Sequence, residues 1–407
     1  MDNLNLTPFR KTVVGVQFLF VAFGSTVLVP LLVGLDPATA LFSAGIGTLI
    51  FHLVTKGIVP IFLGSSFAFI SPIIAASAQW GLSGTLAGFA GVSIIYFIMA
   101  GLIKWKGMQL LDKLFPPVVI GPVIMLIGLS LSGTAVDMAK TDWLLALVAL
   151  TVSVIVMIYG KGLLQLLPVI SGIIAGFVVA ICLGKVDFTS VADASWFTLP
   201  ENIRNPQLPS FSWEPFVFMM PVALAAVVEH VGDVYAIGAV ADKDFVKNPG
   251  LHRTMLGDGL ACLAAALMGG PPVTTYSEVT GAVQITRITN PQVIRIAAVS
   301  AILFSIVGKL NAILQAIPQA VLGGIMLLLF GSIAAVGVQN MMRNHVDFGV
   351  TRNIIIASVI LTTGIGGAAL TAGSFSLSGI GLAALIGLLL NLILPKDKKH
   401  GMDDILI

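Results

Sequence analysis

The sequence is poor in charge, and this shortage excludes the usual soluble classes. Only 10% of its 407 residues are Asp, Glu, Lys or Arg, whereas soluble domains average about 25%. So few charges cannot cover a surface that faces water, but a surface that faces lipid needs none. The net charge of +2 gives no basis for binding nucleic acid. The composition therefore predicts a protein embedded in a lipid bilayer, without a nucleic-acid partner.

Cysteine is nearly absent. The two cysteines, Cys182 and Cys262, both lie in apolar runs, which predicts two buried free thiols and excludes a disulfide framework. The sequence also lacks the metal-ligand clusters, Ser/His pairs and phosphate-binding loops that enzymes use. We therefore expect no metal, no cofactor and no enzymatic activity.

Apolar stretches fill the sequence instead, and 57% of the residues are hydrophobic. A membrane-spanning helix needs about 20 apolar residues. The polar N-terminus leads into the first stretch without a small-residue cleavage site, so we expect this stretch to remain as a span. Spans are predicted at about 12–34, 38–55, 60–80, 83–103, 116–136, 143–160, 162–184, 214–239, 250–269, 272–286, 294–316, 318–338, 350–369 and 375–395. The predicted fold class is an all-α polytopic membrane protein with fourteen transmembrane segments.

The distribution of basic residues supports this number of spans. With a cytoplasmic N-terminus, only Lys140, Lys185, Arg204 and Lys309 fall outside, and the other seventeen of the 21 Lys and Arg residues fall in cytoplasmic loops. This is the bias that the positive-inside rule requires, and a wrong number of spans would scramble it. Both termini are therefore predicted to be cytoplasmic.

The longest polar segment, at about 185–213, separates seven spans from seven. An odd number of spans in each half inserts the second half upside down, which is typical of an inverted repeat. The sequence PVVIGPVIML at 117–126 resembles PQAVLGGIML at 318–327, and these segments open the fifth and twelfth spans. The Ser-Ser-Phe of 65–67 likewise resembles the Thr-Thr-Tyr of 274–276 in the third and tenth spans. We predict two inverted seven-span repeats.

The third and tenth spans are expected to be only half helical, because 64–72 and 269–276 are rich in Ser, Thr, Pro and Gly. Irregular backbone at membrane depth is tolerated where it lines a cavity or pairs internally. The half-helices that follow offer free N–H donors at a partially positive end. Two broken segments in matching positions favour a transporter's binding site. The alternative is a pair of kinked spans whose hydroxyls bond their own helices.

Two of only four glutamates lie inside predicted spans. Glu229 is in the middle of the eighth span, and Glu278 follows the broken part of the tenth. A carboxylate at bilayer depth costs about 2.5–3.5 kcal/mol on insertion scales, so such residues face a cavity and carry function. The alternative, an ion pair between helices, lacks a Lys or Arg in mid-span. We predict that Glu229 and Glu278 form the working site of a transporter.

Three other polar residues lie close to this site in the sequence. Asp233 is one helical turn beyond Glu229, and two carboxylates at this spacing tend to keep one proton between them. Such a pair suits proton coupling, or equally a sodium site. Asp258, in the ninth span, has either a functional or a structural role. His230 points about 100° away from Glu229 and is expected to pack against or bond a neighbouring helix.

Acids line the predicted site and no base does, which narrows the substrate. An inorganic anion would need a cation or helix dipoles alone. A glutamate can accept two N–H bonds from a planar lactam or imide, and N–H groups of the broken segments can donate to its carbonyls. Phe67 and Tyr276 offer faces for stacking a flat ring. This combination favours a nucleobase.

At these residues the chain resembles the nucleobase–ascorbate transporters, and among them the bacterial uracil permeases. The resemblance runs almost end to end, with the motifs FGSTVLVP (23–30), LGSSFAFISP (63–72), LFPPVVIGPV (114–123), EHVGD (229–233), NPGLHRTM (248–255) and GGPPVTTYSEVTGAVQITR (269–287). It implies a core domain of spans 1–4 (1–113) and 8–11 (214–317), and a gate domain of spans 5–7 (114–186) and 12–14 (318–395). An external linker (187–213) and a cytoplasmic tail (396–407) complete the chain. Short antiparallel strands in the third and tenth spans would hold the substrate between them.

The resemblance also implies roles for individual residues. The implied substrate-binding residues are Glu229, Glu278, Phe67, Tyr276, Ser277 and Ser25, with Phe67 and Tyr276 contributing backbone groups. The candidates for binding the coupling ion are Asp233, Glu229 and Asp258. Members of the family resemble proton or sodium symporters that work by an elevator-like movement, often as homodimers. The implied location is a bacterial inner membrane.

Three positions depart from the uracil permease pattern. Asp233 stands where these permeases often carry His and is more similar to the purine and ascorbate branches. Val279 replaces a signature Asn, and Phe330 stands where some relatives have an aromatic hydroxyl. Glu278 favours uracil, whereas Asp233 and Asp258 leave xanthine or another purine open. Proton-coupled uracil import is the leading prediction; the alternatives are sodium coupling, a purine such as xanthine or urate, and an anion exchanger of the same architecture.

Overall fold

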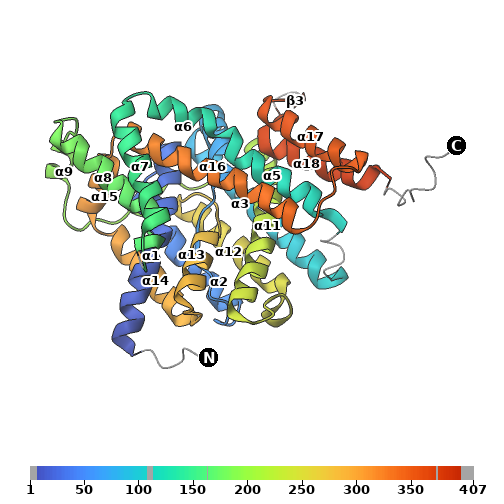
Figure 1. Cartoon of the computed structure of the whole chain (residues 1–407), viewed down its shortest axis with the longest axis horizontal. Coiled ribbons are helices and arrows are strands. Elements are labelled where there is room, and N and C mark those ends of the chain that lie inside the picture. Colours follow the sequence, from blue (N-terminus) through green and yellow to red (C-terminus); the bar gives the residue numbers. More distant parts are fainter. Residues whose placement is uncertain (1–6, 108–112, 163, 373–374, 396–407) are drawn as a thin grey trace.

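The computed structural model describes residues 7–107, 113–162, 164–372 and 375–395 (Figure 1). The predicted cytoplasmic tail, 396–407, lies outside these residues, as do the basic residues Lys396, Lys398 and Lys399 that were assigned to the cytoplasmic side. The described chain is mostly helical, and the predicted class of helical polytopic membrane protein is confirmed.

The helices are α1 (Pro8–Val33), α2 (Pro37–Val54), η1 (Phe67–Phe69), α3 (Ile70–Lys106), α5 (Pro117–Ser130), α6 (Ser132–Ala139), α7 (Trp143–Tyr159), η2 (Leu164–Leu166), α8 (Pro168–Cys182), α9 (Thr189–Asp193), α10 (Glu201–Arg204), α11 (Trp213–Ala241), η3 (Val246–Gly250), α12 (Leu251–Met268), α13 (Ser277–Thr286), α14 (Pro291–Ser305), α15 (Gly308–Gln315), α16 (Gln319–Arg343), α17 (Thr351–Ile365) and α18 (Gly379–Ile393). The strands are β1 (Leu63–Ser65), β2 (Val273–Thr275), β3 (Ala369–Ala372) and β4 (Phe375–Ser378).

Within the described residues, six helical segments are long and apolar enough to cross a membrane: α1, α2, η1 with α3, α5 with α6, α11 and α16. Five shorter apolar helices, α7, α8, α14, α17 and α18, accompany them. The segment that contains α3 joins the predicted third and fourth spans, but its helical geometry is interrupted at Gly81, where φ is 68°. A positive φ of this kind is adopted readily only by glycine, so the break is encoded locally.

The C-terminal spans differ from the prediction. The thirteenth and fourteenth spans were expected at 350–369 and 375–395, but α17 ends at Ile365 and α18 begins at Gly379. Between them β3 and β4 form an antiparallel hairpin. The reason is visible in the alternation Ser-Phe-Ser-Leu-Ser at 374–378, because a period of two is typical of a strand. The hairpin is apolar enough to be mistaken for the ends of two spans.

The helices pack in two groups (Figure 1). In the first group α12 packs against α2 and α3, α11 against α3, and α14 against α1 and α2. In the second group α16 packs against α5, α6 and α7, while α7 packs against α8 and α17 against α18. Helices α11 and α18 form the largest contact between the groups. Segments from both halves of the chain therefore build each group.

The two broken segments meet inside the first group. Strand β1 pairs antiparallel with β2, and Gly64 lies opposite Thr274. Two further bonds extend the pairing, from the Ser66 N–H to the Pro272 carbonyl (3.0 Å) and from the Tyr276 N–H to the Phe62 carbonyl (3.2 Å). Both strands are fully buried. Pairing with each other satisfies backbone groups that a lipid environment would leave unbonded.

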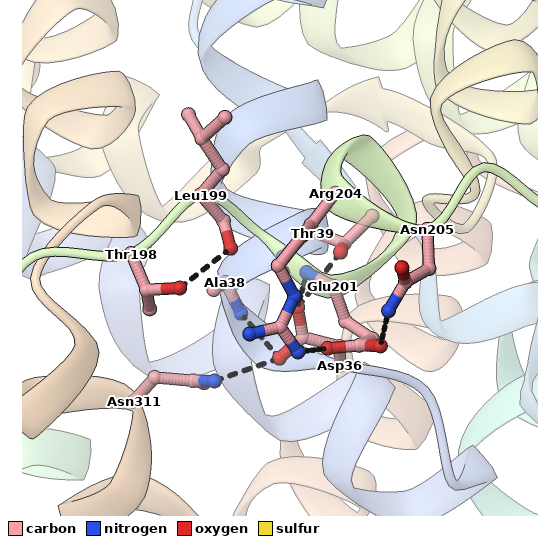
Figure 2. A network of polar contacts seen from close by, with 9 residues as sticks. All are labelled: Asp36, Ala38, Thr39, Thr198, Leu199, Glu201, Arg204, Asn205 and Asn311. Atoms are coloured by element: carbon pink, nitrogen blue, oxygen red, sulfur yellow. Dashed lines mark hydrogen bonds and ion pairs between the residues drawn. The ribbon is translucent and has the colours of Figure 1, made fainter. Parts of the chain in front are cut away.

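The linker between α8 and α11 is fastened to the first group of helices. Asp36, at the start of α2, accepts hydrogen bonds from the Thr39 N–H (3.0 Å), the Glu201 N–H (3.2 Å) and Asn311 Nδ2 (2.8 Å), as Figure 2 shows. Residue Phe197 also forms a β-bridge with Val307. One carboxylate thus joins the linker to α2 and α15.

Contacts at the other end of this linker belong to the second group. Lys185 forms an ion pair with Asp142 at the start of α7, and the hydrogen bond from Lys185 lowers the pKa of the Asp142 carboxyl. The ring of Phe188 lies 6.3 Å from that of Phe177 on α8. The linker therefore passes from one group to the other near Thr189, where α9 begins.

The cysteine prediction is half wrong. Cys262 is buried in α12, but Cys182 is exposed at the end of α8. An apolar run does not distinguish a helix face that packs inside the protein from one that faces lipid, because both are apolar.

Candidate functional site

Glu229 lies on α11, where buried apolar residues such as Val227 and Val228 surround it in the sequence. Its side chain is partly exposed, and no hydrogen-bond partner reaches it from the residues that the structure describes. A carboxylate within a membrane-spanning helix is costly unless a partner satisfies it. Glu229 is therefore an acceptor that is available to a ligand.

Glu278 belongs to the first turn of α13, directly after strand β2. The first N–H groups of a helix have no partner within it and form a partially positive end, which favours a carboxylate at this place. Ser25 on α1 donates a hydrogen bond from Oγ to Glu278 Oε1 at 3.1 Å. Glu278 is exposed whereas Ser25 is buried. Ser25 thus holds one oxygen of this exposed carboxylate.

Asp233 is buried on α11 and is bound by the tenth predicted span. Thr275 donates a hydrogen bond from Oγ1 to Asp233 Oδ2 at 2.6 Å, and Ser277 donates from Oγ to Oδ1. Both carboxylate oxygens therefore accept a hydroxyl. Ser277 directly precedes Glu278 at the start of α13, and Glu229 lies one turn before Asp233 on α11. The structure brings the three acids together around the point where β2 becomes α13.

Exposed residues lead from these acids to one end of the molecule. On α11 the helix face of Glu229 continues through Gly232, Ala236 and Ala239, all of which are exposed. At the opposite end, a Cβ added to Gly269 would stand 2.7 Å from the Asn202 Cβ in the linker. The linker thus covers the turn before β2, at the end of the molecule opposite to the exposed residues of α11.

Tyr276 supports the strand pair from inside. Its side chain is 4% exposed, and its hydroxyl donates to the Ser65 carbonyl at 2.8 Å. Its N–H is bonded to Phe62, and its carbonyl accepts from the Thr280 N–H at 3.2 Å. The ring lies against Gly64, where an added Cβ would stand 2.5 Å from Cε2. Both the ring and the backbone of Tyr276 are thus engaged within the protein.

The close contact between Gly64 and Tyr276 predicts that a larger side chain at position 64 destabilises the protein. Gly64→Ala is expected to displace the Tyr276 ring and lower the free energy of unfolding by about 1–3 kcal/mol. Gly101→Ala is the matched control, because nothing lies within 4 Å of a Cβ added at Gly101 in α3. The measurement is thermal unfolding of both variants in the same detergent. Equal melting temperatures for the two variants would contradict the close packing of Tyr276 on β1.

Phe67 contacts the second group of helices. It opens η1 directly after β1, is 8% exposed, and meets Phe330 of α16 edge to face with ring centroids 6.0 Å apart. Edge-to-face contact is a favourable arrangement for aromatic rings. Phe330, noted in the sequence only for its missing hydroxyl, therefore brings the second group into contact with η1, next to the strand pair.

His230 and Asp258, by contrast, do not face the open side. Both are completely buried and bonded to each other, between α11 and α12. The hydrogen bonds from Thr275 and Ser277 to Asp233 were not predicted from the sequence. Both residues lie in the Thr-Thr-Tyr-Ser segment of the broken span, and this is the one feature that could have indicated them. Among the described residues, no group of three or more His, Cys, Asp or Glu is placed to hold a metal ion. The arrangement can bind a small polar solute through carboxylates and helix-end N–H groups.

Comparison with known proteins identifies the family of this chain. The model of the family described as the Permease family matches residues 9–373. The chain is 48% identical over 405 residues to the "Probable uracil permease" of Haemophilus influenzae, with 97% of each chain covered. It is 44% identical to the "Uracil permease" of Bacillus subtilis (98% and 95% covered) and 37% identical to that of Escherichia coli (95% and 92% covered).

Solved structures share the fold at low identity. The transmembrane domain of the cyanobacterial bicarbonate transporter BicA is similar with a TM-score of 0.60 at 15% identity, covering 94% of this chain and 96% of that one. SLC26A9 is similar with a TM-score of 0.63 at 12% identity, and the match covers 95% of this chain but only 65% of that one. With a family match that spans most of its length, together with close relatives that are named permeases, the chain belongs to the Permease family and is an integral membrane protein rather than an enzyme.

Proposed function

We propose that this protein imports a nucleobase, uracil first among them, in symport with protons across a bacterial inner membrane. The observation that carries the proposal is Glu229, a partly exposed carboxylate on α11 that has no hydrogen-bond partner among the described residues. An unpartnered acceptor inside a membrane protein is best satisfied by a ligand that brings its own N–H groups.

The chemistry of uracil complements this site. Its ring N–H groups donate to Glu229 and to the free oxygen of Glu278. Its carbonyls accept from N–H groups in the first turn of α13, at Ser277 and Glu278, where the helix leaves donors unpaired. Phe67 supplies an apolar contact at the beginning of η1. Ser25 and Tyr276 contribute by holding Glu278 and β1 in place.

The names of the relatives support the choice of base. The relatives at 37–48% identity are called uracil permeases and match over most of the chain. Glu278, whose second oxygen is left to accept an N–H of the base, also favours uracil over an anion. A purine such as xanthine or urate remains the alternative base, on the strength of Asp233.

Asp233 is the group we propose for proton coupling, together with Glu229. Its two oxygens accept hydroxyls from Thr275 and Ser277, so loss or gain of one proton changes the bonds that hold the start of α13. Protonation of Asp233 would therefore change the position of Glu278. Sodium coupling is the variant of this proposal, since carboxylate and hydroxyl oxygens also suit a hard cation.

The helix groups support an elevator movement of a core domain (1–113 and 214–317) against a gate domain (114–186 and 318–395). The proposed topology has fourteen spans in two inverted repeats, with strands in the third and tenth. The hydrogen bonds of Figure 2 hold the Glu201 part of the external linker (187–213) against the core, which supports its movement with that domain. With cytoplasmic termini, the exposed face of α11 opens the site to the cytoplasm. A homodimer is part of the proposal through the family resemblance alone.

An anion exchanger is the second candidate, because BicA and SLC26A9 share the fold. Two carboxylates without a cation among their described contacts disfavour it, since they would repel an anion. Equilibrium binding separates the candidates. Labelled uracil is expected to bind the purified protein and to be displaced by unlabelled uracil but not by bicarbonate. Binding that bicarbonate displaces, or no binding of uracil or xanthine, would overturn the proposal.

Cross-links test the division into core and gate. In a Cys182→Ser background, Phe197→Cys with Val307→Cys joins the linker to the core, whereas Gly24→Cys with Val169→Cys joins α1 to α8 across the two domains. A Cβ on Gly24 would stand 3.1 Å from the Val169 Cβ, within reach of a disulfide. Oxidation is expected to leave uptake intact in the first variant and to stop it in the second, with recovery on reduction. Uptake that survives the oxidised Gly24–Val169 link would contradict the elevator.

A further inference from the structure

A buried polar chain joins α11 to α12 next to the site. His230 Nδ1 lies 2.8 Å from Asp258 Oδ2, and His230 Nε2 lies 2.9 Å from Thr254 Oγ1. All three side chains are 0% exposed. The rings of Tyr96 and Phe51 pack edge-on against the imidazole, at 6.4 and 6.5 Å between centroids. The three hydrogen-bonded side chains are therefore shielded from solvent.

The hydrogen bonds of Thr254 favour one arrangement of the protons. Thr254 has a single hydroxyl hydrogen, and its Oγ1 donates to the Leu251 carbonyl at 3.0 Å. With this hydrogen on the Leu251 carbonyl, Oγ1 accepts from His230 and Nε2 carries a hydrogen. One proton then occupies the bond between His230 Nδ1 and Asp258 Oδ2, on whichever atom it sits. The pair as a whole is neutral, which is the state that a dry interior favours.

The location of His230 gives the pair a mechanical consequence. His230 projects about 100° away from Glu229 around α11, whereas Asp233, one turn further on, lies on nearly the same face as Glu229. Glu229 faces the open side, His230 faces α12, and Asp233 holds β2 and α13. The residues of α11 before them are small and apolar, including Ala223, Ala225 and Ala226, and smooth apolar packing specifies the rotation of a helix poorly. Polar contacts specify the rotation better, and α11 has two sets of them, the bond of His230 to Asp258 and the hydroxyl bonds of Asp233.

We propose that His230 and Asp258 are positioning residues, which fix the rotation of α11 so that Glu229 and Asp233 point into the substrate site. This inference rests on the proposed function, because its effect is read in substrate affinity. The inference also means that Asp258 does not bind the coupling proton. The proton between Asp258 and His230 is buried, whereas Glu229 lies on an exposed helix face.

Asparagine at position 258 tests the proposal directly. Its amide nitrogen would replace Oδ2 and donate to His230 Nδ1, and its oxygen would replace Oδ1, which has no partner among the described residues. Asp258→Asn keeps the positioning bond without a titratable group. Asp258→Ala removes the bond. A milder pair is Thr254→Ser, which keeps the acceptor for Nε2, and Thr254→Val, which removes it.

The experiment measures uracil uptake and pH-driven accumulation in proteoliposomes, corrected for the amount of folded carrier. Asp258→Asn and Thr254→Ser are expected to stay within about threefold of the wild-type KM, with an unchanged accumulation ratio and pH profile. Asp258→Ala and Thr254→Val are expected to raise KM by about tenfold, with a smaller change in Vmax. If Asp258→Ala does not fold, the comparison of Thr254→Ser with Thr254→Val still tests the proposal.

Two results would overturn the inference. One is loss of accumulation with retained exchange in Asp258→Asn, which would place the coupling proton on Asp258. The other is equal KM values for the Asn and Ala variants, or for the Ser and Val variants, which would leave the pair without a positioning effect. Failure of the proposed function is recognised separately, because the wild-type protein would then show no uracil uptake in the same vesicles.

Discussion

Replacement of Glu229 by Gln is expected to abolish uracil uptake and leave the protein folded. A carboxylate accepts N–H bonds at both oxygens, whereas an amide offers one acceptor and turns two hydrogens toward the donors of the base. Hydrogen bonds to charged groups are worth about 1.5–3 kcal/mol, so loss of the bond from uracil to Glu229, with an amide N–H facing the ring N–H in its place, should weaken binding by about 100-fold. No described residue competes for Glu229, so the loss should appear directly as affinity.

The measurement is uptake and equilibrium binding of labelled uracil, with Asp137→Asn as the control. Asp137 is a surface acid on α6 that pairs with Lys140, and it is 68% exposed. It should tolerate the same chemical change with wild-type uptake. A folded Glu229→Gln protein that still concentrates uracil normally would remove Glu229 from the site.

Asp233→Asn is expected to separate binding from coupling. The variant keeps an oxygen that can accept from Thr275 or Ser277, so uracil should still bind and exchange across the membrane. It cannot gain or lose a proton at neutral pH, so a pH gradient should no longer drive accumulation. Uracil inside the vesicles should rise only to the outside concentration.

The readouts are counterflow exchange and pH-driven accumulation in the same proteoliposomes. Thr275→Val is the matched control, because it removes one hydroxyl from Asp233 and retains the carboxylate; it should accumulate uracil with an altered KM. If Asp233→Asn accumulates uracil as well as the wild type does, the coupling proton resides elsewhere.

Several features followed from the residues alone, for physical reasons. The low charge predicted a bilayer environment, because lipid is the only surroundings in which so apolar a surface is stable. Glu229 and Glu278 stood out because a carboxylate at bilayer depth is expensive. The Gly, Pro, Ser and Thr content of the third and tenth spans predicted irregular backbone there. The roles of the two acids remain predictions, to be decided by the experiments above.

Other features lay beyond what the residues could tell. Cys182 was expected to be buried, but an apolar run looks the same toward lipid as toward the core. The β3–β4 hairpin lay hidden inside apolar sequence. The partners of Asp233 and Asp258 are 42 and 28 residues away along the chain, and such contacts depend on how helices are rotated. Local pattern specifies which face of a helix is apolar, but not which polar side chains meet across two helices.

Accumulation of labelled uracil in proteoliposomes, with pH and sodium gradients imposed separately, tests the central claim most directly. An inward proton gradient is expected to drive uracil above its external concentration, whereas a sodium gradient alone should not. Collapse of the proton gradient should release the accumulated base. No accumulation of uracil or xanthine under either gradient would contradict the account of this protein as a nucleobase symporter.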